Sequence, residues 1–444
     1  MSTVQIICMI LGVCLLMFLA YKGMNLFLAT VLCALFVCFT NGIPWTDGVI
    51  AGYAAAFSGF VQSNLFVIVT GAIFGQMMSS SGCAESIALK VLGMLGRKRM
   101  LLGLLLVNML FCYVGIAGFV VIFTIAPLAI IMFEKAQLPR WMIPTVTSLG
   151  TSIGCGVLPY SLDILNYTPT RFLGTTLGAA PLLGFVAGGV TFAFGYTYCL
   201  RVRSKYYRSQ GVDTALIYSQ PMDLAPSREG LPPWYLAAIP FLVVVASSMI
   251  SSKLIDSTSA VAISLTAGAV LALLVGIKQK TITFQGGAFT KIFTEGANKG
   301  ILALTSASVV VGFGGVVRMT QAFNTVVAKV LSIDLHPYAS EVISLNVVSG
   351  LLGSSPAAEA LWMESLAQNY VAMGALPEVI HRLAPITALG FNTLPHCAAV
   401  AVSLAYYGLS YKEGYKGMFF TSVIGPIIGA VATMLVAMVL YPIG

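Results

Sequence analysis

The chain has 444 residues, of which 58% are hydrophobic and 9% are charged. A soluble domain carries about 25% charged residues, so this composition excludes a soluble globular protein and indicates an integral membrane protein. The formal net charge of +8 comes from Lys and Arg in short loops beside apolar segments. This pattern orients membrane proteins in the bilayer, and we expect no nucleic-acid partner.

Apolar segments of about 20 residues, long enough to cross a bilayer, recur along the whole chain. The first lacks a charged leader and a cleavage site, so we expect a retained span and not a signal peptide. The predicted spans are 4–20, 25–40, 56–78, 101–133, 177–200, 234–250, 260–277, 300–317, 339–370 and 418–441. Those at 101–133 and 339–370 are interrupted by Gly, Ser or Pro, which predicts broken transmembrane helices. The Pro-containing segments that follow them, 139–175 and 377–416, are predicted to be re-entrant helical hairpins.

The nine cysteines lie mostly within apolar runs and form no Cys-x-x-Cys pair. The sequence therefore predicts neither a disulfide framework nor a zinc site. We expect no cofactor and no metal.

The two halves of the chain resemble each other. Phe74-Gly75 recurs as Phe313-Gly314, 239 residues later. Other pairs with nearly the same spacing are Lys90-Val91-Leu92 with Lys329-Val330-Leu331, Asn108 with Asn346, Gly115 with Gly353, Leu138-Pro139 with Leu376-Pro377, and Leu158-Pro159 with Leu394-Pro395. A spacing kept over so long a stretch indicates an internal duplication.

The basic loops indicate how the repeats are oriented. Arg97-Lys98-Arg99 corresponds to Asp334-Leu335-His336, and Lys278 and Lys280 correspond to the uncharged residues 40–42. Because positive charge marks the cytoplasmic side, equivalent loops should face opposite sides of the membrane. We therefore predict an all-α polytopic membrane protein of two inverted-topology repeats, each with a broken transmembrane helix and a re-entrant helical hairpin.

The predicted domain organisation follows from the repeats. Repeat 1 covers residues 1–200, a cytoplasmic linker covers 201–232, and repeat 2 covers 233–444. The predicted scaffold spans are 1–80 and 233–318, the arm helices are 84–96 and 320–332, and the transport elements are 101–200 and 338–444.

The broken spans are the predicted binding site, because half-helix ends at membrane depth form substrate and ion sites in transporters. Glycine lets the chain leave the helix, and the N–H groups that follow favour an anion. The alternatives are close helix packing through small residues and, for the hairpins, ordinary loops. The predicted substrate-binding residues are Gly115, Ala117, Gly118, Thr151, Ser152, Ser161, Asn166, Thr170, Ser354, Ser355, Asn392, Thr393 and His396.

Ionisable side chains within apolar segments are costly and are functional by default. We expect Asp163, Glu359, Glu364 and His396 to couple movement of the substrate to H+, with Na+ as the other possible ion. An imidazole titrates near neutral pH, which suits His396 to carrying a proton or binding an anion. Pairing with a basic residue of the scaffold is the alternative for the two glutamates.

Several sequence blocks resemble the gluconate permease (GntP) family. In the first half they are Gly115-Ile-Ala-Gly-Phe-Val-Val, Leu138-Pro139-Arg140, Leu158-Pro159, Asn166 and Thr168-Pro169-Thr170-Arg171-Phe-Leu-Gly174-Thr175. In the second half they are Gly353-Ser354, Glu364, Pro377-Glu378-Val-Ile-His381-Arg382, Thr393-Leu-Pro395-His396 and Leu409-Ser-Tyr-Lys412-Glu413. The resemblance covers nearly the whole chain.

This resemblance implies a fold of the ion transporter superfamily, in which a transport domain moves against a scaffold as an elevator. It implies a multi-pass protein of the inner membrane, a homodimer by analogy of fold, and no enzymatic activity. The implied function is import of a small organic anion, such as gluconate, another sugar acid or 3-hydroxybutyrate, by proton symport.

The chain departs from the family pattern at both predicted hairpins. The family usually reads Asp-Thr-Leu-Pro-His-Asn-Gly where this chain has Asn392 in place of the acid and Cys397-Ala398 at the end. It usually reads Leu-Pro-Gly-Ser-Pro-Gln where this chain has Tyr160-Ser161-Leu162-Asp163 after Leu-Pro. Our hypothesis is that Asp163 takes over the charge or proton role of the acid missing at Asn392.

Two other functions compete with this interpretation. An inorganic-ion exchanger of the Na+/H+ antiporter type shares the broken-helix design but needs more buried carboxylates near the breaks. An intramembrane hydrolase would use Ser354 or Ser355 as nucleophile and His396 as base, but neither serine stands in a Gly-x-Ser-x-Gly elbow.

Overall fold

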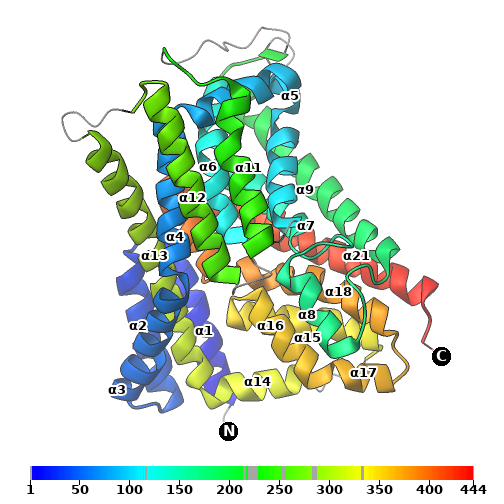
Figure 1. Ribbon diagram of the computed structural model, residues 1–444. Coiled ribbons are helices and arrows are strands. Elements are labelled where there is room, and N and C mark those ends of the chain that lie inside the picture. Colours follow the sequence, from blue (N-terminus) through cyan, green and yellow to red (C-terminus); the bar gives the residue numbers. More distant parts are fainter. Residues whose placement is uncertain are drawn as a thin grey trace.

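The protein is helical throughout the residues that the structure describes (Figure 1). The computed structural model describes residues 3–113, 115, 118–213, 217–218, 229–251, 257–282, 288–331 and 335–443. The first half contains α1 (Thr3–Tyr21), α2 (Leu26–Asn41), α3 (Trp45–Asp47), a π-helical stretch (Gly48–Ala54), α4 (Ala55–Ser80), α5 (Cys83–Tyr113), α6 (Gly118–Lys135), α7 (Met142–Gly154), α8 (Ile164–Leu173) and α9 (Pro181–Ser209).

The second half contains α11 (Trp234–Ser251), α12 (Ser257–Lys278), α13 (Ala288–Met319), α14 (Gln321–Leu331), α15 (Pro337–Leu352), α16 (Ser355–Trp362), α17 (Gln368–Ala372), α18 (Pro377–Gly390), α19 (Ala398–Tyr407), α20 (Tyr411–Phe419) and α21 (Gly425–Leu440). A π-helical stretch (Met363–Ala367) joins α16 to α17, another (Phe420–Ile424) joins α20 to α21, and a 3-10 turn (Phe391–Thr393) extends α18.

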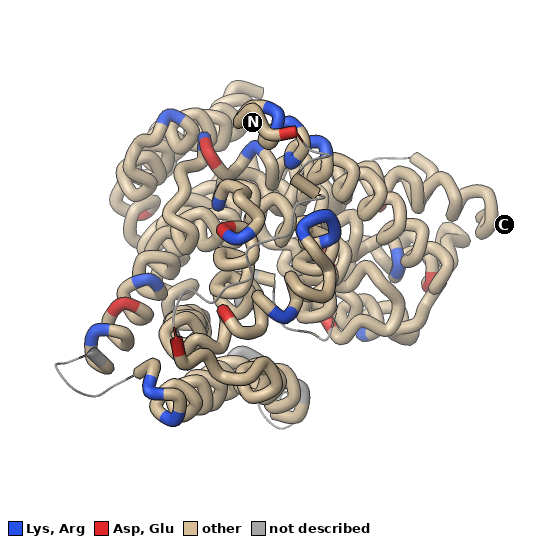
Figure 2. Tube along the Cα trace, turned by 90° about the horizontal axis from the view of Figure 1, so that it is seen from above, with Lys and Arg blue, Asp and Glu red and all other residues tan. Residues whose placement is uncertain are grey.

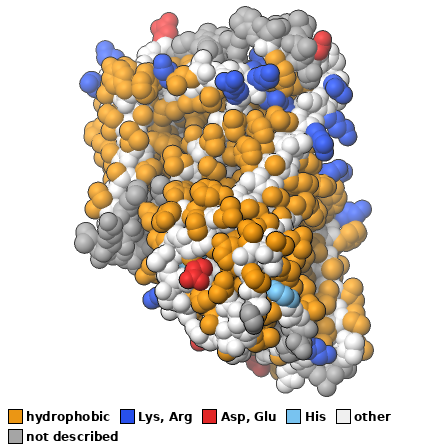
Figure 3. All heavy atoms as spheres, turned by 90° about the vertical axis from the view of Figure 1, so that its right-hand side faces the viewer, with side chains coloured by type: hydrophobic (Ala, Val, Ile, Leu, Met, Phe, Trp, Pro, Cys, Tyr) orange, Lys and Arg blue, Asp and Glu red, His pale blue; other side chains and the backbone are white. Residues whose placement is uncertain are grey.

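Several of these helices are long and apolar enough to cross a membrane. Within the described residues there are six such segments, and a bent pair of helices would make a seventh. The six are Thr3–Tyr21, Trp45–Ser80, Pro181–Ser209, Ser259–Lys278, Phe289–Met319 and Tyr411–Leu440. Viewed from above, nearly all of the chain trace carries neither acidic nor basic residues (Figure 2). The side view shows a broad hydrophobic band with Lys and Arg gathered toward its upper end (Figure 3). The protein is therefore an all-α polytopic membrane protein.

The long helices α4 and α13 pack against each other along much of their length. Two glycines of α13 allow this close approach: a Cβ on Gly296 would lie 2.9 Å from the Cα of Ile73, and one on Gly300 would lie 2.8 Å from the Cα of Val69. Small residues at such contacts let membrane helices pack backbone to backbone. α4 also contacts α12, and α13 also contacts α2, so helices from the two halves alternate in this part of the molecule.

The second half contains a re-entrant hairpin made of α15 and α16. The Trp362 Nε1–H of α16 donates to the Ser344 hydroxyl of α15 at 2.7 Å. Both residues lie about two turns from the break, so this bond requires α16 to fold back along α15. The tip is formed by Gly353, with φ of +60°, and by Ser354 in an extended conformation.

α5 and α6 form the corresponding hairpin in the first half, because they pack along each other on either side of Gly115. Gly115 has φ of +93°, a conformation that glycine adopts without a steric penalty. Within the described residues, neither α7 and α8 nor α18 and α19 pack along each other in this way. α18 with its 3-10 extension and α19 meet at a bend of 58°, so the chain continues across this break.

The sequence-based assignment of hairpins and broken spans is therefore wrong in one respect: the two kinds of element are exchanged. Residues 101–133 and 339–370 form hairpins, whereas 139–175 and 377–416 contain the broken helices. Both kinds of element show the same sequence pattern, two apolar stretches around Gly, Ser or Pro. Whether the chain turns back or continues depends on packing with distant helices, which the pattern does not contain.

Candidate functional site

A cavity of about 370 Å³ lies where the hairpin tips meet the helix breaks. Small-molecule sites typically measure roughly 300–1,000 Å³, so this cavity can hold a small ligand. α4 and α13 contribute Phe60 and Arg318 to its wall. The predicted residues that line it are Gly118, Thr151, Ser152, Asp163, Ser354, Ser355, Asn392, Thr393 and His396.

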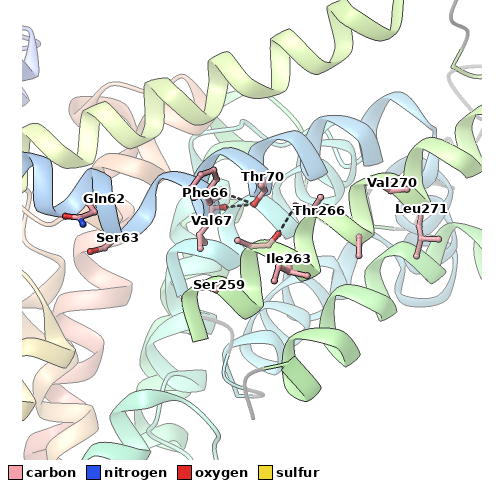
Figure 4. Close-up of a pocket in the computed structure, with 12 residues that line it drawn as sticks. Gln62, Ser63, Phe66, Val67, Thr70, Ser259, Ile263, Thr266, Val270 and Leu271 are labelled. Atoms are coloured by element: carbon pink, nitrogen blue, oxygen red, sulfur yellow. Dashed lines mark hydrogen bonds between the residues drawn. The ribbon is translucent and has the colours of Figure 1, made fainter. Parts of the chain in front are cut away.

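A larger pocket of about 1080 Å³ lies between α4 and α12, but its lining is less suited to a polar ligand (Figure 4). Its walls contain Phe66, Ile263 and other apolar residues and no charged side chain. The hydroxyls of Thr70 and Thr266 bond to the carbonyl oxygens of their own helices, at 2.6 and 2.8 Å. The smaller cavity, which combines charged, amide and hydroxyl groups, is the candidate site.

Four helices begin at the smaller cavity, since α6, α8, α16 and α19 all contribute their first residue to its lining. The N-terminal end of a helix carries partial positive charge and presents N–H groups to an anion. α16 and α19 have no side-chain cap. α8 is capped by Asp163, whose Oδ1 accepts the N–H of Leu165 at 3.0 Å. This arrangement favours a negatively charged ligand.

Two side chains hold the tip of the second hairpin against the second helix break. His396 Nε2 donates to the carbonyl oxygen of Gly350 at 2.7 Å. This bond assigns the proton to Nε2, and the buried Nδ1 has no hydrogen-bond partner. Asn392 Oδ1 accepts the N–H of Ser355, the first residue of α16, at 3.1 Å. Both side chains line the cavity, so they link its wall to the hairpin tip.

An asparagine ties each hairpin to a broken span. Asn108 of α5 donates from Nδ2 to the carbonyl oxygen of Thr147 at 2.9 Å and to the hydroxyl of Thr151 at 3.0 Å. Asn346 of α15 accepts the N–H of Phe391 at 3.2 Å through its Oδ1. Each asparagine lies seven residues before the glycine of its tip, so the same element of sequence positions both hairpins.

Some predicted residues lie away from the cavity lining. Ser161 is buried, and its hydroxyl donates to the carbonyl oxygens of Tyr113 and Gly154, both at 3.2 Å. Thr170 bonds to a carbonyl oxygen of its own helix. The predicted residues that do not line the cavity are Gly115, Ser161, Asn166, Thr170, Glu359 and Glu364. Glu364 is exposed, and Ala117 lies outside the residues that the structure describes.

Asn166 belongs to a buried clamp between the two halves. Its Oδ1 accepts from His381 Nε2 at 2.9 Å and from the Arg382 guanidinium at 2.9 Å, both from α18. Arg382 is fully buried and also donates to the carbonyl oxygens of Ala179 and Leu177, each at 2.8 Å. These residues therefore hold the first broken span against the second and do not face the cavity.

Sequence reasoning missed two charged residues. Arg318, at the end of α13, lines the cavity and is a cation beside the helix N-termini. Glu341 of α15 is fully buried, and neither of its carboxylate oxygens has a hydrogen-bond partner. The sequence feature that could have identified Arg318 and Glu341 is a single charged residue within, or at the end of, an apolar segment.

Known membrane transporters are similar in sequence to this chain. The sequence model of the GntP family permeases matches residues 4–439. An uncharacterized transporter, YxjC of Bacillus subtilis strain 168, is 28% identical over 95% of this chain and 96% of its own length. A high-affinity gluconate transporter of Escherichia coli K12 is 22% identical over 99% of this chain and 100% of its own length. Among solved structures, Neisseria gonorrhoeae MtrF, described with a class of antimetabolite efflux pumps, aligns with 90% of this chain and 85% of its own at a TM-score of 0.36 and 11% identity.

Proposed function

The chain belongs to the GntP family of permeases, and we propose that it is a secondary active transporter that imports a small organic anion. It is a multi-pass protein of the inner membrane and a transporter, not an enzyme. The proposed substrate is gluconate, another sugar acid or a hydroxy acid such as 3-hydroxybutyrate. The high-affinity gluconate transporter among its relatives supports a hydroxylated carboxylate as the substrate class.

The observation that carries this proposal is the convergence of four helix N-termini on one cavity. Their partial positive charges would stabilise a carboxylate, except at α8, whose N-terminus is already capped by the carboxylate of Asp163. Arg318 at the wall adds a full positive charge. Thr151, Ser152 and Ser354 line the same cavity and would bond to the hydroxyl groups of the substrate.

The proposed mechanism is an elevator built from two inverted repeats. The matching order of elements supports the repeats: α1, α2 and α4 correspond to α11, α12 and α13, the hairpins and broken spans follow in the same order, and α9 corresponds to α20 with α21. Gly96, with φ of +66°, separates an arm helix from the rest of α5, as α14 is separate from α15. The spans before each arm helix would form the scaffold and, by analogy of fold, the homodimer contact. The hairpins, broken spans and last helices would move.

We propose H+ as the coupling ion, with Asp163 and His396 as cavity groups that take part. They line the cavity from opposite halves of the chain. Asn392 stands at the position of the acid expected in the family, and its Oδ1 accepts the N–H of Ser355. An ionised carboxylate could accept the same hydrogen bond. Asp163, at the start of α8, would supply the negative charge from the other side of the cavity.

The experiment is uptake of radiolabelled gluconate, 3-hydroxybutyrate, a dicarboxylate and a neutral sugar into proteoliposomes. Each compound is tested with an inward H+ gradient, an inward Na+ gradient and no gradient, with protein-free liposomes as control. We expect one hydroxy or sugar acid to accumulate with the H+ gradient. H+ or Na+ flux without uptake of any organic anion would contradict the proposal and favour an inorganic-ion exchanger.

A further inference from the structure

Two glutamates of the second hairpin are buried without partners. Glu341 of α15 and Glu359 of α16 both have no exposed surface. None of their four carboxylate oxygens has a hydrogen-bond partner. An ionised carboxylate in such surroundings is very costly unless it is paired and hydrogen-bonded, so these side chains require a ligand that removes their charge.

The hairpin geometry places both glutamates on the faces that α15 and α16 present to each other. Trp362 donates to Ser344 at 2.7 Å across the hairpin. Glu359 precedes Trp362 by three residues, and Glu341 precedes Ser344 by three, so each glutamate shares a helix face with a partner in this bond. Because α15 and α16 run in opposite directions, Glu359 lies one turn closer to the hairpin tip than this bond, and Glu341 lies one turn closer to the base. Both carboxylates therefore lie within the same helix interface, at two levels along it.

Within the described residues, no cation forms a hydrogen bond with either glutamate. From α18, Arg382 and His381 are directed to Asn166 and to carbonyl oxygens of the first half. From α17, Tyr370 stacks on Trp362 with ring centroids 5.5 Å apart. α8, whose N-cap is the acid Asp163, packs against α16. Tyr338 of α15, which accepts the N–H of Leu376 just before Glu378, and Lys329 of α14, a helix that contacts α15, are further titratable groups toward the hairpin base.

We propose that Glu341 and Glu359 form the proton-binding site that couples H+ movement to substrate movement, an assignment that rests on the proposed function. Each carboxyl is fully buried and has no hydrogen-bond partner, which disfavours its ionised form, so each can hold a proton. A proton fits better than a metal cation, because neither glutamate borders the cavity. Within the described part of the chain, no group of three or more His, Cys, Asp or Glu side chains is arranged to hold a metal ion.

The pair is connected to the substrate cavity through α16. Ser355, the first residue of α16, lines the cavity, and Glu359 lies one turn further along the same helix face. Asp163, the N-cap of α8, also lines the cavity, and α8 packs against α16. A proton would enter from cavity water beside the starts of these two helices. Binding of the substrate at the N-terminus of α16 would change the surroundings of Glu359.

The test uses the full-length protein in proteoliposomes with the substrate identified by uptake. Two readouts are compared: accumulation driven by an inward H+ gradient, and counterflow, which is the exchange of external labelled substrate for internal unlabelled substrate without a gradient. The variants are Glu341→Gln, Glu359→Gln and the double variant, since Gln resembles a protonated Glu and preserves the fold. Glu134→Gln, at an exposed glutamate near the C-terminal end of α6, is the matched control.

We expect the double variant to lose gradient-driven accumulation and substrate-induced proton uptake while keeping counterflow. The control should keep all three. Infrared difference spectra of the wild type should show a protonated carboxyl band that changes when substrate is added and disappears in the double variant. Normal proton-driven accumulation by the double variant would overturn the assignment while leaving the transport function intact. Absence of organic-anion uptake by the wild type would instead contradict the proposed function itself.

Discussion

Replacement of Arg382 by Gln should destabilise the contact between the two halves of the protein. The buried guanidinium donates to Ala179, Leu177 and Asn166 at 2.8, 2.8 and 2.9 Å. A hydrogen bond from a charged group contributes about 1.5–3 kcal/mol, and relief from burying the guanidinium offsets part of the loss. We expect a net loss of about 3–5 kcal/mol, as when one partner of a buried charged group is removed. At roughly 2 °C per kcal/mol for a large chain, the unfolding temperature should fall by about 6–10 °C.

The assay is thermal unfolding in detergent, followed by the loss of the monodisperse peak in size-exclusion chromatography. The matched control is Arg171→Gln, because Arg171 is exposed on α8 and lies over the ring of Tyr167, 5.9 Å from its centroid. Arg382→Lys should be intermediate, since one ammonium group cannot reach all three acceptors. An unfolding temperature of Arg382→Gln equal to that of Arg171→Gln would refute the idea that this clamp holds the two broken spans together.

Three further substitutions test other parts of the structure. Gly353→Ala places a residue with a side chain in the left-handed region at the hairpin tip, which should lower the stability of the tip by about 1–2 kcal/mol and reduce uptake. The control is Gly189→Ala, which should leave uptake unchanged because a Cβ there meets no atom within 4 Å. Trp362→Phe removes the bond to Ser344 and should lower stability by about 1 kcal/mol, measured as a lower unfolding temperature. Arg318→Gln removes an exposed cation from the cavity wall and should raise KM for the anion several-fold with little change in maximal rate. An unchanged KM at low ionic strength would contradict the idea that Arg318 attracts the anion.

The positions of the helix interruptions could be predicted from the sequence, because their cause is local. Gly115 and Gly353 adopt positive φ, and each is followed by a new helix. The polar residues after the interruptions were also predictable, since unpaired polar groups are excluded from lipid. Thr151, Ser152, Asp163, Ser354, Ser355, Asn392, Thr393 and His396 all line the same cavity.

The direction of the chain after each interruption could not be predicted. Whether α16 folds back along α15 depends on contacts such as the bond between Trp362 and Ser344, which are not visible in a hydropathy pattern. The same limit applies to Asn166. Its position beside the predicted site suggested a ligand contact, but its partners, His381 and Arg382, come from more than 200 residues away.

The charged residues at the edges of apolar segments were the least predictable. Arg318 resembles the flanking cation that ends many membrane helices, and the packing of α13 against α19 brings it to the cavity. Glu341 stands alone in an apolar helix, and its relation to Glu359 arises from the hairpin fold. In both cases the role depends on a neighbour that is distant in sequence.

The most direct test of the account is a structure of the protein determined with the transported anion bound. We predict that the anion occupies the cavity between the hairpin tips and the helix breaks, with its carboxylate at the N-termini of α16 and α19 and within reach of Ser354 and His396. The prediction would be contradicted if the anion occupied only the larger pocket between α4 and α12, or a site that none of the four helix N-termini faces.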